Sequence, residues 1–228
     1  DESSVVHTPR KKKSARGTPQ VCSTVLTEDQ QELLEAVTKD GKLGKLEYSS
    51  FFTGNTTHLI VGDKKRTLKV LYALARGIWI IKPNWLIDSI ENGSFLPEDK
   101  YEANDWFPGA KICRMNREEN TPIFASKKFF FYKGTSIPPE ELETIVTHAG
   151  GIMKKAKGCD ICISDEAIPT IVEKEIPIMS SAWVLDSLEK GKLLDYEDYI
   201  LFEEEVDDDE EEGDSEEKKP APKSKKKQ

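Results

Sequence analysis

The sequence predicts an α/β protein of two similar units packed in tandem, each a small parallel sheet with helices on both faces. Residues 84–93 recur as residues 182–191 with the same tryptophan, aspartate, serine, glutamate and glycine, and Trp85 and Trp183 are 98 residues apart. A repeat at this spacing indicates two domain-sized units rather than a solenoid. In each unit, short apolar segments alternate with amphipathic ones over short connections, which is typical of parallel strands joined by helices.

The first unit is expected to run strand, helix, strand, strand, helix, strand, helix. Its first helix starts at Thr27, where Gln30 completes a capping box. Its second helix is apolar on nearly every side, so we expect the sheet to cover one side and the second unit the other. Gly77 ends that helix, and Asn84 caps a third helix that stops near Gly93. The predicted strands are 20–25, 46–52, 57–61 and 78–81, and the second helix is 66–76.

The second unit repeats this pattern. Its helix 138–148 has proline in the first turn and Gly150-Gly151 at its end. We interpret residues 96–126, between the units, as a linker. That segment holds Pro97, Pro108, Gly109 and Pro122. The predicted strands of the second unit are 128–132, 152–155, 159–164 and 176–179.

The two ends of the chain differ in composition from the part between them. Residues 1–19 hold five basic residues, two acids and almost no apolar content, and residues 203–228 hold twelve acids and six lysines. Neither segment can bury an apolar core, so we expect both to be disordered. The expected organisation is a basic tail 1–19, a first domain 20–95, the linker 96–126, a second domain 127–202, and a tail 203–228 that is acidic and then basic.

Composition also limits the function. The chain has 228 residues and a net charge of −9, of which residues 21–202 carry −6, so sequence-specific nucleic-acid binding is not expected. No apolar run is long enough to cross a bilayer, so we expect no membrane association. We find no phosphate loop, nucleophile–base pair or metal-ligand set, so we expect a monomeric non-enzyme without metal or cofactor. Because the first residue is Asp1, we interpret the chain as a fragment of a longer protein.

The cysteines favour a reducing compartment. Cys159 and Cys162 form one C-x-x-C, but a zinc site needs a second pair or spaced histidines, so we interpret all four cysteines as reduced core thiols. Reduced thiols suit the cytosol or the nucleus. The basic run 9–13 is either a nuclear localisation signal or a solvating segment.

Two features are expected to meet at the carboxyl edge of the first sheet, where ligands bind in parallel α/β folds. Ser23-Thr24-Val25 ends a strand just before a helix, so a hydroxyl and free backbone N–H groups there would suit an anion. A plain strand end with a helix cap explains the same residues. Lys69 lies in the first turn of the largely buried second helix, and its ammonium favours an anionic ligand. The alternative is a lysine that extends to solvent.

Several linked motifs carry a resemblance to a known family. They are Thr56-Thr57-His58-Leu59-Ile60-Val61, Arg66-Thr67-Leu68-Lys69, Gly77-Ile78-Trp79-Ile80-Ile81, Trp85-Leu86-Ile87-Asp88-Ser89, Gly150-Gly151 and Trp183-Val184-Leu185-Asp186-Ser187. Together, over residues 20–202, they resemble tandem BRCT domains, in an order and spacing close to the microcephalin and breast-cancer-susceptibility group. The resemblance implies two four-stranded parallel sheets. It also implies that the second helix of the first unit packs against the first and third helices of the second unit.

The resemblance also implies a phosphoserine site in the first unit. The family's motif places the phosphate on the Thr24 hydroxyl, the Val25 N–H and Lys69, with Thr67 supporting Lys69. Many members have glycine where this chain has Val25, and a shift of one residue would make Ser23 the hydroxyl donor. The second unit has no matching lysine, because its stretch Glu166-Ala167-Ile168-Pro169-Thr170 contains no basic residue. We therefore expect one phosphate site.

A second implied feature is a pocket between the units for the residue three positions after the phosphoserine. The matching positions are Arg66, Leu71, Ser136, Ile137 and Leu185. The Arg66 backbone would bind the peptide main chain, and its guanidinium would pair a carboxylate, including a free C-terminus. Ordinary packing between the units also explains the three apolar residues.

The resemblance implies a nuclear phosphopeptide reader in DNA-damage signalling. Its partner would be a phosphoserine-containing protein, with a phosphorylated histone C-terminal tail as one candidate. The alternative is a BRCT scaffold that docks a partner protein without phosphate. A peptide that binds equally with and without its phosphate would favour that alternative.

Overall fold

The first unit contains one four-stranded sheet in the strand order β2-β1-β3-β4, with every neighbouring pair parallel. The computed structural model describes residues 17–132, 134–166 and 176–201. The predicted tail 203–228 and all but the last three residues of the predicted tail 1–19 therefore lie outside the described residues. The elements of this unit are β1 (Gln20–Thr24), α1 (Glu28–Asp40), β2 (Glu47–Tyr48), β3 (His58–Val61), α2 (Leu68–Arg76), β4 (Trp79–Ile81) and α3 (Asn84–Asn92). Their order is the predicted one, although β2 is shorter than the predicted strand 46–52.

The second unit has a sheet with the equivalent strand order, β6-β5-β7-β8, again parallel throughout. Its elements are β5 (Lys128–Phe131), α5 (Pro139–His148), β6 (Ile152–Met153), β7 (Ile161–Ile163), β8 (Ile178–Met179) and α7 (Ser181–Lys190). The second helix expected in this unit would follow β7, and residues 167–175 of that segment lie outside the described residues. The two sheets confirm the predicted repeat and its α/β class.

Side chains that alternate along the strands divide the first unit into two layers. Leu59, Val61 and Ile80 are buried in a cluster with the apolar residues of α2. Ile60 and Ile81, one position along, are buried in a second cluster with α1 and α3. Because successive strand residues point to opposite faces, α2 covers one face of the sheet, and α1 and α3 cover the other.

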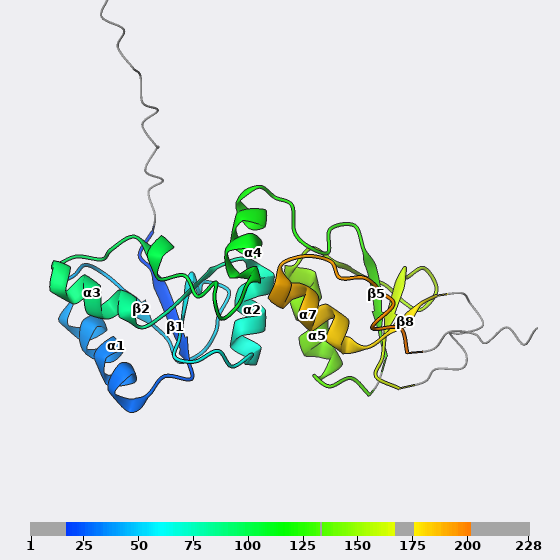
Figure 1. Cartoon of the computed structure of the whole chain (residues 1–228), viewed down its shortest axis with the longest axis horizontal. Coiled ribbons are helices and arrows are strands. Elements are labelled where there is room, and N and C mark those ends of the chain that lie inside the picture. Colours follow the sequence, from blue (N-terminus) through cyan, green and yellow to red (C-terminus); the bar gives the residue numbers. More distant parts are fainter. Residues whose placement is uncertain (1–16, 133, 167–175, 202–228) are drawn as a thin grey trace, which may run out of the picture.

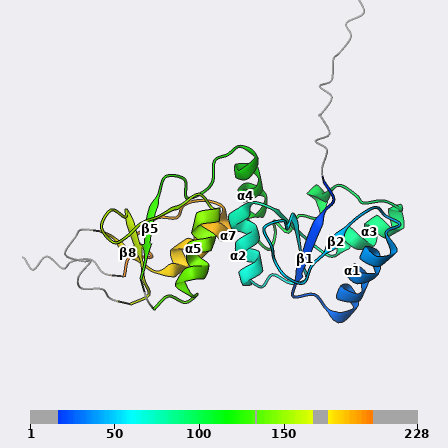
Figure 2. The same cartoon turned by 180° about the vertical axis from the view of Figure 1, so that it is seen from behind.

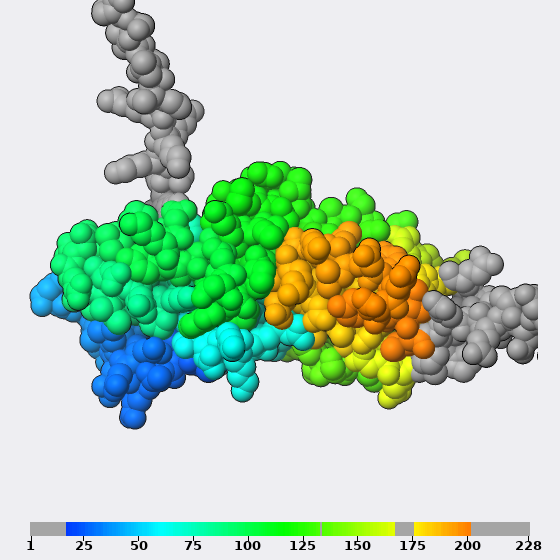
Figure 3. Space-filling model, in the orientation of Figure 1, coloured from blue at the N-terminus to red at the C-terminus, as the bar shows by residue number. Residues whose placement is uncertain are grey.

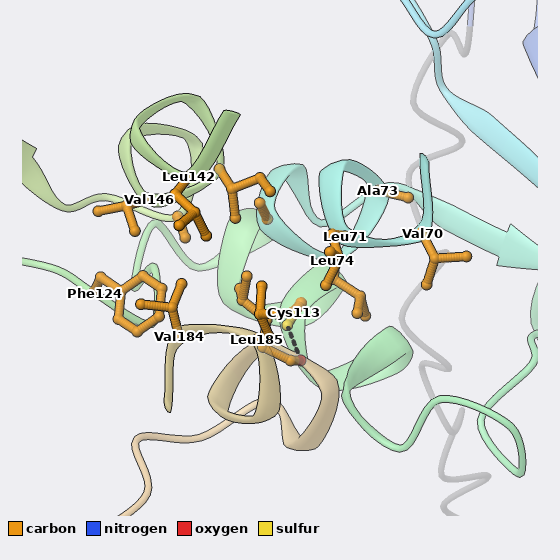
Figure 4. Close-up of a cluster of buried hydrophobic side chains, with 14 of the residues drawn as sticks. Val70, Leu71, Ala73, Leu74, Cys113, Phe124, Leu142, Val146, Val184 and Leu185 are labelled. Carbon is orange, nitrogen blue, oxygen red and sulfur yellow. Dashed lines mark hydrogen bonds between the residues drawn. The ribbon is translucent and has the colours of Figure 1, made fainter. Parts of the chain in front are cut away.

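The two units meet along α2. This helix packs against α5 and α7 of the second unit, as the resemblance implied, so it is buried on both sides. Figures 1 and 2 show α2 at the junction, with α1 and α3 at the far end of the first unit. Figure 4 shows the apolar side chains of α2, α5 and α7 that fill this junction, which we call the seam. Its central residues include Leu71, Leu74, Leu142, Val146 and Leu185.

The linker is more ordered than its prolines suggested. It contains a short helix η1 (Glu98–Lys100) and a ten-residue helix α4 (Gly109–Glu118), which the sequence analysis did not predict. Pro108 immediately precedes α4, where a missing N–H costs nothing. α4 packs against both α2 and α7, so the linker closes one side of the seam.

One predicted helix start is confirmed and one is wrong. Thr27 and Gln30 form the reciprocal capping box at the start of α1. Asn84 was expected to cap α3, but the cap is Pro83, which makes no side-chain hydrogen bond, and Asn84 is the first helical residue. The helix starts one residue earlier than predicted because proline already has the backbone φ that a helix needs, −59° here.

Candidate functional site

Two hydroxyl groups meet where β1 ends and α2 begins. Thr24 is the last residue of β1, and Thr67 is the N-cap of α2. Their Oγ1 atoms are 3.2 Å apart, within hydrogen-bonding distance, and both side chains are half-buried. The Thr67 hydroxyl also accepts a hydrogen bond from the Val70 N–H at 3.4 Å. The structure thus brings together the predicted Thr24 and Thr67 at the carboxyl edge of the sheet.

The Lys69 ammonium lies at the same edge. Its Nζ donates to the carbonyl oxygens of Ser23 and Ser50, each at 2.8 Å. The side chain therefore reaches from α2 across the end of β1 to the loop after β2, and it does not extend freely into solvent. An ammonium has three N–H donors, so one remains for a ligand. The Ser50 carbonyl was not predicted, because a backbone acceptor leaves no mark on the sequence.

Val25, which follows Thr24, has a backbone conformation that favours glycine. Its φ is +54°, and its side chain is 39% exposed. A β-branched residue rarely adopts positive φ. Among the described residues no acceptor takes the Val25 N–H, so this donor is available beside Thr24. Gly62 allows the turn, because a Cβ there would lie 2.1 Å from the Val25 carbonyl oxygen.

Ser23 has its hydroxyl on the opposite face of the sheet. Ser23 is 7% exposed, and its Oγ lies 3.1 Å from Gln31 Oε1 and 3.2 Å from the Tyr48 hydroxyl. Neighbouring strand residues alternate in direction, so the Ser23 and Thr24 hydroxyls cannot both face Lys69. The contribution of Ser23 to the edge is its carbonyl group, which binds Lys69. We call Thr24, Val25, Thr67 and Lys69 the phosphate corner.

Arg66, just before α2, bridges the two units. Its Nη1 donates to Asp186 Oδ1 at 2.5 Å and to Glu189 Oε2 at 2.9 Å, both on α7. Burial alone would lower the pKa of Arg66, but these two carboxylates outweigh it and raise the pKa. Arg66 was a predicted site residue, but its two acidic partners were not predicted. The signal that could have found them is the acid pair that recurs at the same spacing in both copies of the repeat.

The apolar residues of the expected peptide pocket lie in the seam. Leu71 is 2% and Leu185 is 6% exposed, and Ile137 is half-buried against the same core cluster. The two leucines and Ile137 thus share one core cluster that spans both units, and ordinary packing between the units explains most of their burial.

Asp165 gathers several hydrogen-bond donors at the start of α7 in the second unit. Its carboxylate accepts hydrogen bonds from the Ser136 N–H at 2.7 Å, the Ser180 hydroxyl at 2.8 Å, and the N–H and hydroxyl of Ser181 at 2.8 and 2.7 Å. Burial alone would raise the pKa of Asp165, but these donors outweigh it and lower the pKa. The Ser136 hydroxyl also lies 2.7 Å from the Ser181 hydroxyl. Ser136 is thus held against the start of α7, and Asp165 was not predicted.

The four cysteines are buried thiols, and none of them forms a disulfide. Burial raises the pKa of Cys113 and of Cys162 to about 12. Within the described ranges, no three His, Cys, Asp or Glu side chains are grouped to hold a metal ion. No helix among the residues with a described structure is both long and apolar enough to span a bilayer.

Comparison with family models identifies both units. Residues 20–90 match the model described as the BRCA1 C Terminus (BRCT) domain, and residues 122–200 match a second model described as the BRCT domain. The two matched segments cover more than half of the chain. They correspond to the two sheets with their helices, and α4 lies between them.

Similar proteins agree with these family matches. Microcephalin of Mus musculus is 35% identical over 156 residues, which cover 65% of this chain and 19% of the relative. The chain thus spans about a fifth of the length of that relative. The S. pombe Brc1 BRCT5-BRCT6 structure covers 81% of this chain and 97% of its own, with a TM-score of 0.56 and 16% identity. The structure of Rtt107p in complex with a phosphorylated histone covers 82% of this chain and 94% of its own, with a TM-score of 0.50 and 14% identity. At these identities the two structures show the fold alone.

Proposed function

The chain belongs to the BRCT family, whose domains are binding modules, and on that premise we propose that it binds a phosphoserine-containing peptide. The first unit would hold the phosphate, and the seam would hold the residue three positions further along the peptide. We infer that binding of such a peptide serves nuclear DNA-damage signalling, because Rtt107p, a solved relative of the fold, is in a complex with a phosphorylated histone.

The observation that carries the proposal is the convergence of unlike donors at the phosphate corner. The Thr24 and Thr67 hydroxyls are 3.2 Å apart, the Val25 N–H is available, and the Lys69 ammonium lies at the same edge. A phosphate monoester carries about −1.5 to −2 charges and three acceptor oxygens. Hydroxyl, amide and ammonium donors at the start of a helix match that demand, and the partial positive charge of the helix N-terminus adds to it.

The flanking charge supports the same ligand. Four cations lie between residues 64 and 69, preceded by Asp63. Lys64 and Lys65 are exposed, so they would attract an anionic peptide without holding it in a fixed geometry. Each charge-assisted hydrogen bond contributes about 1.5–3 kcal/mol, and ordering the peptide offsets part of this, so an affinity of about 1 μM is expected.

A phosphorylated histone tail is one candidate partner. One solved relative of the fold, Rtt107p, is in a complex with a phosphorylated histone. In this chain a terminal carboxylate would have to compete with Asp186 and Glu189 for Arg66. We therefore propose that a free C-terminus adds at most a few-fold to the affinity. A comparison of free and amidated peptides measures this contribution.

The test is a calorimetric titration of a serine peptide with and without its phosphate, using an apolar residue three positions after the serine. Phosphorylation should strengthen binding at least tenfold. Thr24→Ala and Lys69→Met should each lower the affinity for the phosphorylated peptide about tenfold or more, since a loss of about 1.4 kcal/mol in binding free energy is a tenfold change in affinity. Lys39→Met is the matched control, because Lys39 is an exposed lysine on α1, away from the corner, and should leave the affinity unchanged.

A phosphate-independent scaffold is the second candidate function. The observation favouring it is that Lys69 already binds two carbonyl oxygens, as a purely structural lysine would. In that case the phosphorylated and unphosphorylated peptides bind equally, and Lys69→Met lowers stability without changing the ratio of the two affinities. The same titration therefore separates the two functions.

A further inference from the structure

The outer face of the first unit carries an apolar groove between α1 and α3. The groove has a volume of about 570 Å³, and its apolar lining includes Leu33, Val37, Leu43 and Ile90. Figures 1 and 2 show α1 and α3 at the end of the first unit away from the seam. The groove is thus remote from α2, at whose N-terminal end the phosphate corner lies.

In the internal repeat, two exposed apolar positions of α3 have equivalents on α7 that are covered by other helices. Ile87 and Ile90 of α3 correspond in the repeat to Leu185 and Leu188 of α7. The two leucines are 6% and 0% exposed because α2 and α4 cover them, whereas both isoleucines are 43% exposed. The same apolar positions are therefore retained on both helices, but within the described part of the chain they are covered on only one.

The acidic residues of this surface are repeated as well. Asp88 and Glu91 of α3 correspond to Asp186 and Glu189 of α7. Asp88 accepts a hydrogen bond from the Tyr101 hydroxyl at 2.8 Å, and Asp186 accepts the equivalent one from Tyr199 at 3.0 Å. The aspartate is thus held in the same way on both units.

The two acid pairs differ in whether a basic side chain binds them. The other carboxylate oxygen of Asp186 accepts a hydrogen bond from Arg66, which also donates to Glu189. Among the described residues, no basic side chain pairs with Asp88 or Glu91. The acid pair of α3 is therefore placed as on α7 but has no arginine.

We propose that the α1–α3 groove docks an amphipathic helix of another protein that resembles α2. Such a helix would carry arginine just before its first turn, to meet Asp88 and Glu91. It would carry leucines at the spacing of Leu71 and Leu74, to cover Ile87 and Ile90. A second copy of this chain cannot supply α2, because α2 is already buried in its own seam. This inference does not depend on phosphate binding.

The test uses a labelled helical probe and the intact chain. The probe is a fluorescein-labelled peptide with the sequence of residues 64–77, held helical by a lactam bridge on its polar side. We expect saturable binding by fluorescence anisotropy and at least a tenfold loss in the Ile90→Lys variant. Met115→Lys is the matched control, since Met115 is also 43% exposed but lies on α4, and it should bind as the parent does.

A charge exchange tests the arginine. The Glu91→Lys variant of the chain should bind the probe several-fold more weakly. A second probe that carries Arg66→Glu should recover most of the lost affinity for that variant, and for that variant only. The Lys69→Met variant of the intact chain should bind the unaltered probe with the affinity of the parent. A loss of phosphopeptide binding in that variant would therefore not affect this test.

Three results would overturn the inference. The first is no saturable binding up to millimolar probe. The second is probe binding that Ile90→Lys leaves unchanged. The probe would then be bound outside the groove, for example in the seam in place of α2. The third is a dimer seen by sedimentation that Ile90→Lys dissociates, because a second copy would then occupy the groove.

Discussion

Among the individual residues, Val25 decides the shape of the phosphate corner. Its φ of +54° turns the chain directly after Thr24, the last residue of β1. For residues other than glycine, this conformation costs about 1–2 kcal/mol of stability. The sequence predicted a role for the Val25 N–H, but a valine carries no signal for positive φ, so its conformation could not be predicted. Gly62 is the second requirement, because the Val25 carbonyl approaches its α-carbon too closely for any side chain.

Val25→Gly should therefore stabilise the protein slightly and preserve phosphopeptide binding. Relief of the strain outweighs the greater freedom of glycine in the unfolded chain, which costs about 0.5–1 kcal/mol. We expect a gain of about 0.5 kcal/mol in the free energy of unfolding, measured by urea denaturation, and an unchanged peptide affinity. A tenfold loss of affinity would show that the valine side chain itself contacts the ligand.

Among the elements, α2 and its neighbours were the most predictable, and α4 was the least. The apolar surface of α2 on all sides predicted its position between a sheet and a second unit. α4 was missed because Pro108 and Gly109 resemble a turn when read in isolation, although proline just before a helix is common. The partners of Arg66 were missed because Asp186 and Glu189 lie on another unit, more than a hundred residues away.

Asp165 links two elements of the second unit, the loop containing Ser136 and the start of α7. Its pKa in the folded state is lowered because hydrogen bonds to the carboxylate outweigh its burial. A lowered pKa means that the stabilisation is fully present above the unfolded-state pKa of about 3.9 and is lost as the pH falls through the folded-state pKa.

Asp165→Asn should thus lower the free energy of unfolding at pH 7, and the difference from the parent should shrink below about pH 4. Urea unfolding at pH 7, 5, 4 and 3 measures this. A difference that stays constant across that range would mean that the charge of Asp165 does not contribute. The variant should also weaken binding of the phosphopeptide, since Asp165 holds Ser136, which is one of the expected pocket residues.

At the scale of the whole molecule, the seam makes the two units and the linker into one body. α4 approaches α7 so closely that a Cβ on Gly109 would lie 2.3 Å from the Leu188 carbonyl oxygen. The Cys113 thiol donates to the same carbonyl at 3.7 Å (Figure 4). Figure 3 shows the linker and the second unit in continuous contact along one face. The Arg66 ion pairs cross the same junction beside the expected peptide pocket.

Gly109→Ala should therefore destabilise the whole chain by about 2 kcal/mol, because overpacking a close contact costs about 1–3 kcal/mol. Gly54→Ala is the matched control, since a Cβ at Gly54 meets nothing within 4 Å. Thermal and urea unfolding of both variants provide the comparison. Equal stabilities would show that α4 and α7 can separate without loss, and that the seam is looser than described.

The most direct test of the central claim is the amide spectrum of the ¹⁵N-labelled chain during a phosphoserine-peptide titration. The account predicts that the Val25 N–H moves strongly downfield, as expected for a donor to phosphate, and that the unphosphorylated peptide leaves it in place. Tight binding of the phosphorylated peptide with an unmoved Val25 signal would contradict it, because the phosphate would then be bound away from Thr24 and Lys69.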